Sequence, residues 1–520
     1  MKGNWLGLVA WLTGGVSAFA DVQVTGLFGD NMVLQRDVPV PVWGMASPGE
    51  AVTVKIAGVQ ETVHTNAQGQ WCARLPAMKA SAQPQQMTIG GKNLLVMQNV
   101  LVGDVWVCAG QSNMEMPLAQ CDAAQDIAAA NFPSLHWIKP SKRALGWPGR
   151  EVVGHWDSCS PANAATMTAA GFYFSRRIQK ETGMPVGLVD ISWNGSAIEP
   201  WMPAEAFARE PTLAKILENL NKPADTWRDG AKARLDALAN WIPAARQAMA
   251  RLGGEIPPPP PLPSDPLVDE HFPTTIYNGM VYPVTSLAIK GVIWYQGESN
   301  GGEGIDSYQM KMRALINGWR EVWNQGDFPF YFVQLASFES PTAAPAAAGP
   351  YARNREAQLR CLQLPHTGMA VAADIGDEKD IHPKDKLDVG ERLAAWALHN
   401  EYGHKEVVPS GPLFKSMKVE ERKIRLEFDY VGAGLMIGKK DGRQPVVEEK
   451  EGKLKQFAVA GADRKWFWAE AVIEGQCIVV SSPQVPNPVA VRYAYDHNPV
   501  GCNLYNKDGL PASPFRTDKW

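Results

Sequence analysis

The chain has 520 residues, a formal net charge of −4 and 45% hydrophobic residues. A chain of this length can bury a large core and form several domains. The slightly acidic balance argues against a nucleic-acid-binding protein, which would show an excess of basic residues. No segment after residue 20 is long and apolar enough to form a membrane helix. We therefore expect a folded protein without nucleic-acid or membrane partners.

The first twenty residues have the pattern of a secretory signal. Lys2 supplies a positive start, residues 5–16 are mostly apolar, and Ala18-Phe19-Ala20 matches a small-x-small cleavage site. The apolar run is too short to span a bilayer. We expect residues 1–20 to be a signal peptide and the mature protein to be periplasmic or extracellular. The alternative is a buried N-terminal strand.

The seven cysteines do not form a recognisable framework, because their number is odd and their spacing irregular. In an exported protein some of them could be oxidised. A local bridge between Cys108 and Cys121 and buried free thiols both remain open.

Both ends of the mature chain read as β structure. Residues 21–99 contain short runs rich in β-branched and aromatic residues, such as 38–43 and 51–56, separated by Gly, Pro, Asn and Asp turns. We expect an N-terminal β-sandwich domain there. Residues 408–520 have the same character and predict a C-terminal β domain.

Residues 100–407 follow a strand, loop, helix pattern, which predicts an α/β fold with an open parallel sheet and helices on both faces. A helix is expected over 172–181, ending at Gly183, and another over 308–323. Residues 203–266 form a helical and Pro-rich insertion whose five consecutive prolines favour a stiff surface spacer. Buried strands are expected at 105–109, 186–192, 288–295, 328–335 and 369–374.

Polar clusters follow four of these strands, at residues 111–113, 194–196, 296–300 and 374–382. In a parallel α/β sheet, ligands bind at the carboxyl ends of the strands. A random surface would scatter such groups, so the pattern predicts one site at this edge of the sheet.

Hydrolysis of an ester needs a nucleophile, a base, a group that orients the base, and donors for the oxyanion. Ser112 follows a buried strand and can supply the nucleophile and a backbone donor. Gly195 can bring its N–H close to a ligand, and Gln296 and Asn300 offer side-chain amides. His382 lies in an acidic run and can be the base.

Two other interpretations of that acidic run are open. His382 can be a solvated loop histidine. The run can also be a calcium loop, although it lacks the alternating carboxylates and the turn glycine of an EF-hand. We expect no metal and no cofactor.

Several motifs resemble the sialate O-acetylesterase family of SGNH-type hydrolases. They are "GQSNMEMPL", "WNGSAIEPW", "YNGMVYP", "WYQGESN", "DIGDEKDIHPKDK" and the ending "RYAYDHNPVGCNLYNKDGLPASPFRTD". The resemblance covers nearly all of the mature chain. It implies a flavodoxin-like SGNH core and metal-free removal of acetyl groups from sugar hydroxyls.

Carried over by position, the resemblance makes Ser112 the nucleophile, His382 the general base and Gly195 an oxyanion donor. Many SGNH enzymes have an Asp three residues before the His, where this chain has Lys379. The orienting acid is therefore Asp380 or Glu298. The usual Gly-x-Asn block is replaced by Gln296-Gly297-Glu298, so we expect Gln296, with Asn300 behind it, as the further donor.

Three more residues are expected to contact substrate: Asn113, Arg355 and Gln358. The alternative for Asn113 is a helix cap, and for the nearby Glu115 a first-turn helix charge. We expect Trp193, Trp201 and Trp294 to be core residues rather than platforms on which a sugar stacks.

The expected function is a carbohydrate O-acetylesterase that acts on sialic acid through an acetyl-enzyme. The motifs indicate the acyl group better than the sugar, so xylan or another acetylated glycan is the nearest alternative. A non-catalytic carbohydrate-binding protein is less favoured, because the proposed set of site residues is intact. A lipase or thioesterase would need a broad apolar lid, which the Pro-rich insertion does not resemble.

Overall fold

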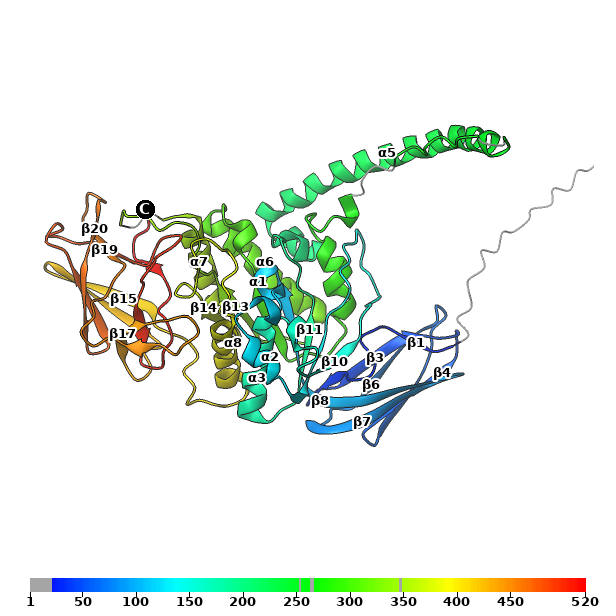
Figure 1. Cartoon of the computed structure of the whole chain (residues 1–520), viewed down its shortest axis with the longest axis horizontal. Coiled ribbons are helices and arrows are strands. Elements are labelled where there is room, and N and C mark those ends of the chain that lie inside the picture. Colours follow the sequence, from blue (N-terminus) through cyan, green and yellow to red (C-terminus); the bar gives the residue numbers. More distant parts are fainter. Residues whose placement is uncertain (1–20, 252–253, 262–265, 346–347) are drawn as a thin grey trace, which may run out of the picture.

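The computed structural model describes residues 21–251, 254–261, 266–345 and 348–520. The expected signal peptide lies outside these residues. Strands of the N-terminal part, a central α/β part and strands of the C-terminal part follow one another along the long axis of the molecule (Figure 1). Among the described residues, no helix combines the length and apolar character needed to cross a bilayer.

The central sheet holds the parallel strands in the order β11-β8-β12-β13-β14, with β9 and the antiparallel β10 beyond β11. When the five parallel strands from β8 to β14 in this order are numbered by their position in the chain, with β8 as the first, their order in the sheet is 2-1-3-4-5. This is a doubly wound order. The bounds are β8 Leu94–Gly110, β9 Phe132–Ile138, β10 Trp156–Cys159, β11 Val186–Asp190, β12 Gly291–Tyr295, β13 Phe330–Gln334 and β14 Thr367–Val371.

Side chains of the central strands alternate between two hydrophobic clusters, because successive residues of a strand point to opposite faces. In β8, Val105 and Val107 belong to the cluster that includes α6, while Trp106 and Cys108 belong to the cluster that includes α3 and α8. The sheet is therefore covered on both faces, as predicted. Trp201 and Trp294 are fully buried and meet edge to face at 5.5 Å, so they are core residues.

The two helices predicted over 172–181 and 308–323 are present as α3 and α6, each beginning three residues earlier than predicted. Helix α3 ends at Gly183, which adopts a left-handed conformation with φ 68°. The helices are α1 Ser112–Glu115, α2 Ala124–Ala128, α3 Ala169–Thr182, α4 Ala204–Arg209, α5 Pro211–Met249, α6 Ile305–Trp323, α7 Pro350–Arg360 and α8 Lys386–Glu401.

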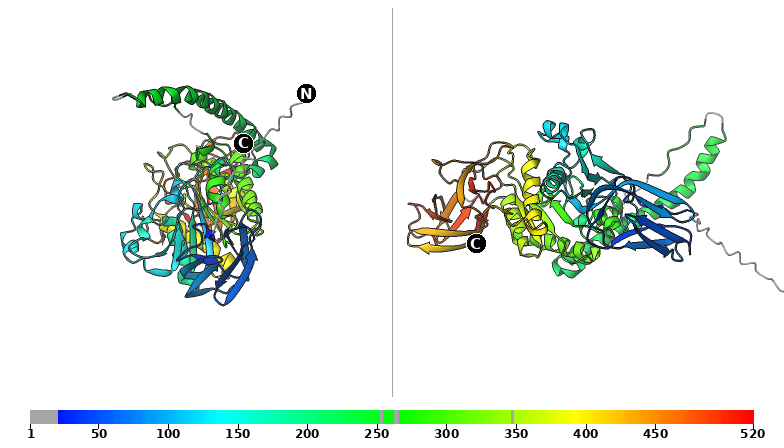
Figure 2. Two further views of the ribbon diagram at one scale, coloured as in Figure 1. Left: turned by 90° about the vertical axis from the view of Figure 1, so that its right-hand side faces the viewer. Right: turned by 90° about the horizontal axis from the view of Figure 1, so that it is seen from below.

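The insertion forms a long arm. Helix α5 extends away from the body of the molecule in each view (Figures 1 and 2). The proline segment returns beside it, because the Trp241 indole donates to the Pro257 carbonyl at 2.8 Å and the Arg234 guanidinium donates to the Pro260 carbonyl at 3.0 Å.

The N-terminal strands are not separated from the central sheet. Strand β8 runs through residue 100 without a break and pairs with β2 and β7 before it enters the parallel sheet. The expected boundary thus falls inside a strand. The N-terminal strands are β1 Gln23–Val24, β2 Val33–Gln35, β3 Val40–Met45, β4 Ala51–Ile56, β5 Val59–His64, β6 Gln70–Leu75 and β7 Ser81–Gly90.

The C-terminal strands form three antiparallel sheets around their own hydrophobic cluster. All seven cysteines are free thiols, so the possible bridge between Cys108 and Cys121 is absent. The strands are β15 Leu413–Glu420, β16 Lys423–Asp429, β17 Leu435–Lys439, β18 Val447–Glu448, β19 Phe457–Ala460, β20 Trp466–Trp468, β21 Glu470–Glu474, β22 Cys477–Ser481, β23 Ala490–Tyr493, β24 Leu504–Asn506 and β25 Phe515–Arg516.

Candidate active site

Ser112 and His382 meet at the carboxyl edge of the parallel sheet. Ser112 is the first residue of α1, directly after β8, and His382 lies in the loop between β14 and α8. Gly110 allows the end of β8 to lie close to β12, since a Cβ there would lie 2.2 Å from the Tyr295 carbonyl oxygen. The Ser112 Oγ is 2.9 Å from Nε2 of His382, which is hydrogen-bond distance between a nucleophile and a base.

The other ring nitrogen of His382 faces Asp380. Its Nδ1 lies 3.2 Å from Oδ1 of Asp380, and the same oxygen accepts the His382 backbone N–H at 2.8 Å. A carboxylate that accepts from Nδ1–H leaves Nε2 free to take the serine proton. The Asp380 side chain is 50% exposed, so water weakens this contact.

Glu298, the other candidate for the orienting acid, lies in the loop after β12 and contacts Asn113, the residue after Ser112. Its Oε1 accepts a hydrogen bond from Nδ2 of Asn113 at 2.5 Å, and its Oε2 is buried with no hydrogen-bond partner among the described residues. Burial raises the pKa of Glu298, against the opposing effects of its hydrogen bonds and the charges of Lys386 and His382. No hydrogen bond joins Glu298 to His382 in the described structure, so of the two candidate acids only Asp380 is within bonding reach of the ring.

Two backbone donors are free at this edge. In the part of the chain that the structure describes, the N–H groups of Ser112 and Gly195 donate to no acceptor. Gly195 has φ +73° and nothing within 4 Å of an added Cβ, so backbone conformation rather than space favours glycine there. Free, preorganised N–H groups are what an oxyanion hole requires.

Gln296 and Asn300 do not point toward the pocket, contrary to our expectation. Both are buried, and the Gln296 amide donates to Oδ1 of Asn300 at 2.7 Å. The Asn300 amide in turn donates to carboxylates of Glu303 and Glu199, at 2.7 and 3.2 Å. Their donors are therefore already used within the protein. They shape the loop after β12 and are not available to an oxyanion in this arrangement.

The three residues expected to contact substrate are also buried. Arg355 is fully enclosed and donates to the backbone carbonyls of Leu335, Ala336, Asp496 and His497. Gln358, three residues along the same face of α7, donates to the Val333 carbonyl at 3.0 Å. Asn113 is 1% exposed and donates to Glu298. In this arrangement none of the three is exposed to the pocket, and all three brace the loops beneath the site.

A pocket of about 650 Å³ opens beside the serine and histidine. It is rich in lysine. Lys384 is exposed, and its ammonium group makes no hydrogen bond or ion pair with any described residue. The lining residues are Ser112, Glu115, Met116, Pro117, Gln120, Lys139, Lys142, Asn194, Asp380, His382 and Lys384.

Glu115 links two walls of this pocket. Its Oε2 accepts the Asn194 backbone N–H at 2.6 Å, and its Oε1 lies 2.7 Å from the Lys142 ammonium. Lys142 also donates to Oδ1 of Asn194 at 2.9 Å and lies 5.4 Å from the ring centroid of the half-buried Trp193. These contacts hold the loop that carries Gly195 against the segment that carries Ser112.

Sequence reasoning missed Lys386, the first residue of α8. Its buried ammonium donates to Oδ1 of Asn113 at 2.7 Å and to the Pro383 carbonyl at 2.6 Å. It therefore joins the neighbour of Ser112 to the neighbour of His382. Burial lowers the pKa of Lys386 to about 8. The available signal was a lysine placed at the start of an apolar helix directly after the histidine motif.

This burial predicts a pH-dependent difference in stability between the wild type and Lys386→Met. Between pH 8 and about 10.5 the unfolded chain binds the Lys386 proton more tightly than the folded chain does, so raising the pH favours the folded wild type. Between pH 7.5 and 10, urea unfolding should show a relative gain of about 2 kcal/mol for the wild type. The exposed Lys384→Met variant keeps Lys386 and should show the same pH dependence of stability as the wild type. A difference independent of pH would contradict the burial of this charge.

Comparisons with known proteins identify carbohydrate esterases as relatives of this chain. Residues 269–399 match the family model described as carbohydrate esterase, sialic acid-specific acetylesterase. Sialate O-acetylesterase from Rattus norvegicus is 28% identical over 94% of this chain and 92% of its own length. The human sialate O-acetylesterase is 26% identical, over 96% and 93%.

A solved structure is closer still. The carbohydrate acetylesterase from Xanthomonas citri is 36% identical, with a TM-score of 0.79, over 96% of this chain and all of the solved chain.

Among the described residues, no group of three or more His, Cys, Asp or Glu is arranged to hold a metal ion.

Proposed function

Because this chain belongs to the sialate O-acetylesterase family of carbohydrate esterases, we propose that it removes O-acetyl groups from sialic acid through a serine nucleophile. The observation that carries the serine mechanism is the 2.9 Å contact between Ser112 Oγ and His382 Nε2 at the mouth of a 650 Å³ pocket. Carbohydrate acetylesterase activity itself follows from the family.

In the proposed reaction, His382 takes the hydroxyl proton as Ser112 attacks the acetyl carbonyl carbon. The backbone N–H groups of Ser112 and Gly195 stabilise the oxyanion of the tetrahedral intermediate. His382 then gives its proton to the departing sugar oxygen, which leaves an acetyl ester on Ser112. A water molecule, deprotonated by His382, releases acetate and restores the serine.

We also assign the central part to the flavodoxin-like SGNH core. The support is the strand order 2-1-3-4-5, with Ser112 after the first strand, Gly195 after the second, Gln296 after the third and His382 after the fifth. The N-terminal signal pattern supports export to the periplasm or the extracellular space.

The sugar is inferred from the charge of the pocket. Sialic acid carries a carboxylate, and the pocket contains the ammonium groups of Lys139, Lys142 and Lys384 against the carboxylates of Glu115 and Asp380. Lys142 is held by Glu115, whereas Lys384 is without a partner among the described residues and can meet an anion directly. A neutral xylan chain would gain nothing from this unpaired cation.

The proposal is tested by acetate release from 9-O-acetylated sialic acid and from acetylated xylan, side by side. We expect a clear preference in kcat/KM for the sialic acid ester. Preference for xylan would overturn the assigned sugar while keeping the esterase class. Failure to release acetate from either substrate would contradict the proposed function.

Lys384→Gln should weaken the binding of an acidic substrate specifically. Loss of one charged contact with a carboxylate costs about 1 kcal/mol at a partly exposed site, so we expect KM for the sialic acid ester to rise about fivefold. Activity on 4-nitrophenyl acetate, which is neutral, should be unchanged. The measurement is repeated in high salt, where the difference between wild type and variant should shrink. An equal loss on both substrates would contradict a role in carboxylate binding.

A further inference from the structure

The strands near the C-terminus send one loop, residues 440–443, into the side of the catalytic part. Lys440 follows β17, and its side chain is only 9% exposed. Its ammonium lies 2.6 Å from Oδ2 of Asp388 and 3.6 Å from Oδ2 of Asp385. Asp385 is the N-cap of α8 and accepts the Asp388 backbone N–H at 3.1 Å. The C-terminal loop thus contacts the chain three residues beyond His382.

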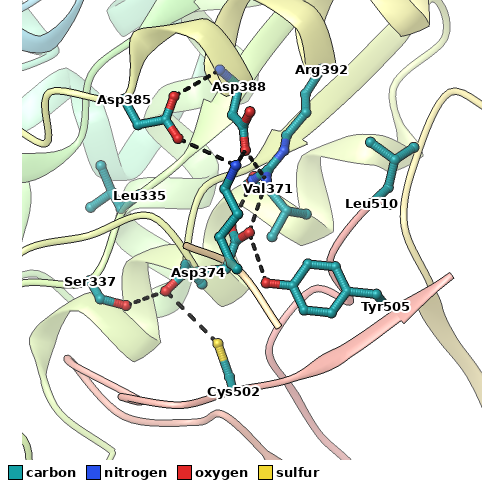
Figure 3. Close-up of polar contacts among 12 residues, drawn as sticks. Leu335, Ser337, Val371, Asp374, Asp385, Asp388, Arg392, Cys502, Tyr505 and Leu510 are labelled. Carbon is teal, nitrogen blue, oxygen red and sulfur yellow. Dashed lines mark hydrogen bonds and ion pairs between the residues drawn. The ribbon is translucent and has the colours of Figure 1, made fainter. Parts of the chain in front are cut away.

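The other end of the histidine loop is fixed by the same β domain. Asp374, just after β14, pairs with the Arg392 guanidinium at 2.7 Å and accepts a hydrogen bond from the Tyr505 hydroxyl of β24 at 3.1 Å. Figure 3 shows Asp374, Asp385 and Asp388 converging on one buried cluster, with Tyr505 reaching it from the C-terminal strands. Asp374 and Asp385 bracket His382.

The loop also reaches the segment that follows Ser112. Arg443 donates to Oδ2 of Asp126 in α2 at 2.5 Å and to the Tyr173 hydroxyl in α3 at 2.7 Å. It also donates to the Asp122 carbonyl. One short loop of the C-terminal β domain therefore touches the serine side and the histidine side of the site.

We propose that Lys440 and Tyr505 are positioning residues for His382, and that the C-terminal β domain serves the reaction by holding both ends of the loop that carries this base. This inference rests on the proposed serine mechanism. The largely enclosed carboxylates of Asp374 and Asp385 and the 18% exposed carboxylate of Asp388 share the cations Arg392 and Lys440. Without Lys440, Asp385 and Asp388 repel each other, and the end of the loop moves relative to Ser112.

The test compares Lys440→Gln with Lys439→Gln in the full chain. Lys439 is the exposed neighbour and makes no described ion pair, so it controls for loss of a lysine in this loop. A small displacement of a base lowers the rate of the chemical step while leaving substrate contacts intact. We expect kcat on 4-nitrophenyl acetate to fall about 10- to 100-fold in Lys440→Gln with KM within about twofold. Lys439→Gln should match the wild type, and Lys440→Arg should recover most of the rate.

Tyr505→Phe is a second variant that tests the same proposal if Lys440→Gln does not fold. It removes one hydroxyl at the opposite end of the loop, and we expect kcat to fall about fivefold, again without a change in KM. Tyr495→Phe is its control, because the Tyr495 hydroxyl donates to Oε2 of Glu356, which stays paired with Arg516, and not to the histidine loop.

Rates are expressed per folded molecule, from the native fraction measured by circular dichroism. Unchanged kcat in folded Lys440→Gln or Tyr505→Phe, with an active wild type, would overturn the positioning role. An inactive wild type would instead contradict the proposed function.

Discussion

Ser112→Ala is expected to lower kcat for acetate release on the order of 100,000-fold, because removal of the nucleophile abolishes the acetyl-enzyme route. The residual rate would come from the free backbone donors and from substrate binding, which do not depend on the serine hydroxyl. KM should change little. Ser112 is half-buried at the start of α1, and among the described residues its hydroxyl bonds only His382, so the fold should tolerate the loss of one oxygen atom.

The measurement is acetate production by wild type and variant, together with mass spectrometry of the peptide that contains Ser112 after rapid acid quench. The wild type should carry one acetyl group on that peptide, and Ser112→Ala should carry none. Ser286→Ala, at an exposed serine whose hydroxyl makes no hydrogen bond in the described structure, is the control and should retain most of the activity. Activity that survives in Ser112→Ala would contradict a serine mechanism, and the pocket would then need a different nucleophile.

The location of the site was predictable from the sequence because it depends on chain order and strand ends. A buried strand that runs into "GQSN" must deliver Ser112 to an edge of the sheet, and the same holds for Gly195 and the loop of His382. Because the strands pair in parallel, their carboxyl ends lie side by side at one edge of the sheet. The structure places Ser112 Oγ and His382 Nε2 2.9 Å apart even though they are 270 residues apart in the chain.

Side-chain direction was not predictable in the same way. Gln296 and Arg355 have donor groups and lie near the site in sequence, yet both turn inward to bond the protein itself. A buried backbone carbonyl without a donor is costly, so polar side chains close to a site are recruited to satisfy the loops as well as to meet substrate. One sequence does not distinguish these two uses.

Long-range contacts account for what was missed. Lys386 bonds Asn113 across 273 residues, and Lys440 reaches Asp388 from a different set of strands. Neither lysine belongs to a local motif with a known spacing. The boundary expected near residue 100 lies within β8, which pairs with β7 and β2 before it enters the parallel sheet, and no turn marks this change of partner.

Asp380→Asn is expected to lower kcat about 100- to 1,000-fold, and Glu298→Gln no more than about tenfold, because of these two acids Asp380 alone is within hydrogen-bond reach of the His382 ring. Asparagine keeps the shape of the side chain, and its oxygen can still accept the His382 backbone N–H. It removes the charge that stabilises the imidazolium, and its amide can favour the tautomer in which Nε2 carries the proton. The loss should be smaller than in a buried triad, since Asp380 is half-exposed and water can replace part of the contact.

Glu298→Gln preserves an oxygen that can accept from Asn113, so the brace beneath Ser112 should survive. The kcat of both variants is measured on 4-nitrophenyl acetate between pH 5 and 9. A large loss confined to Glu298→Gln would transfer the orienting role to the buried glutamate. Its unpartnered Oε2 would then have to rotate toward Nδ1 during the reaction, at the expense of its bond to Asn113.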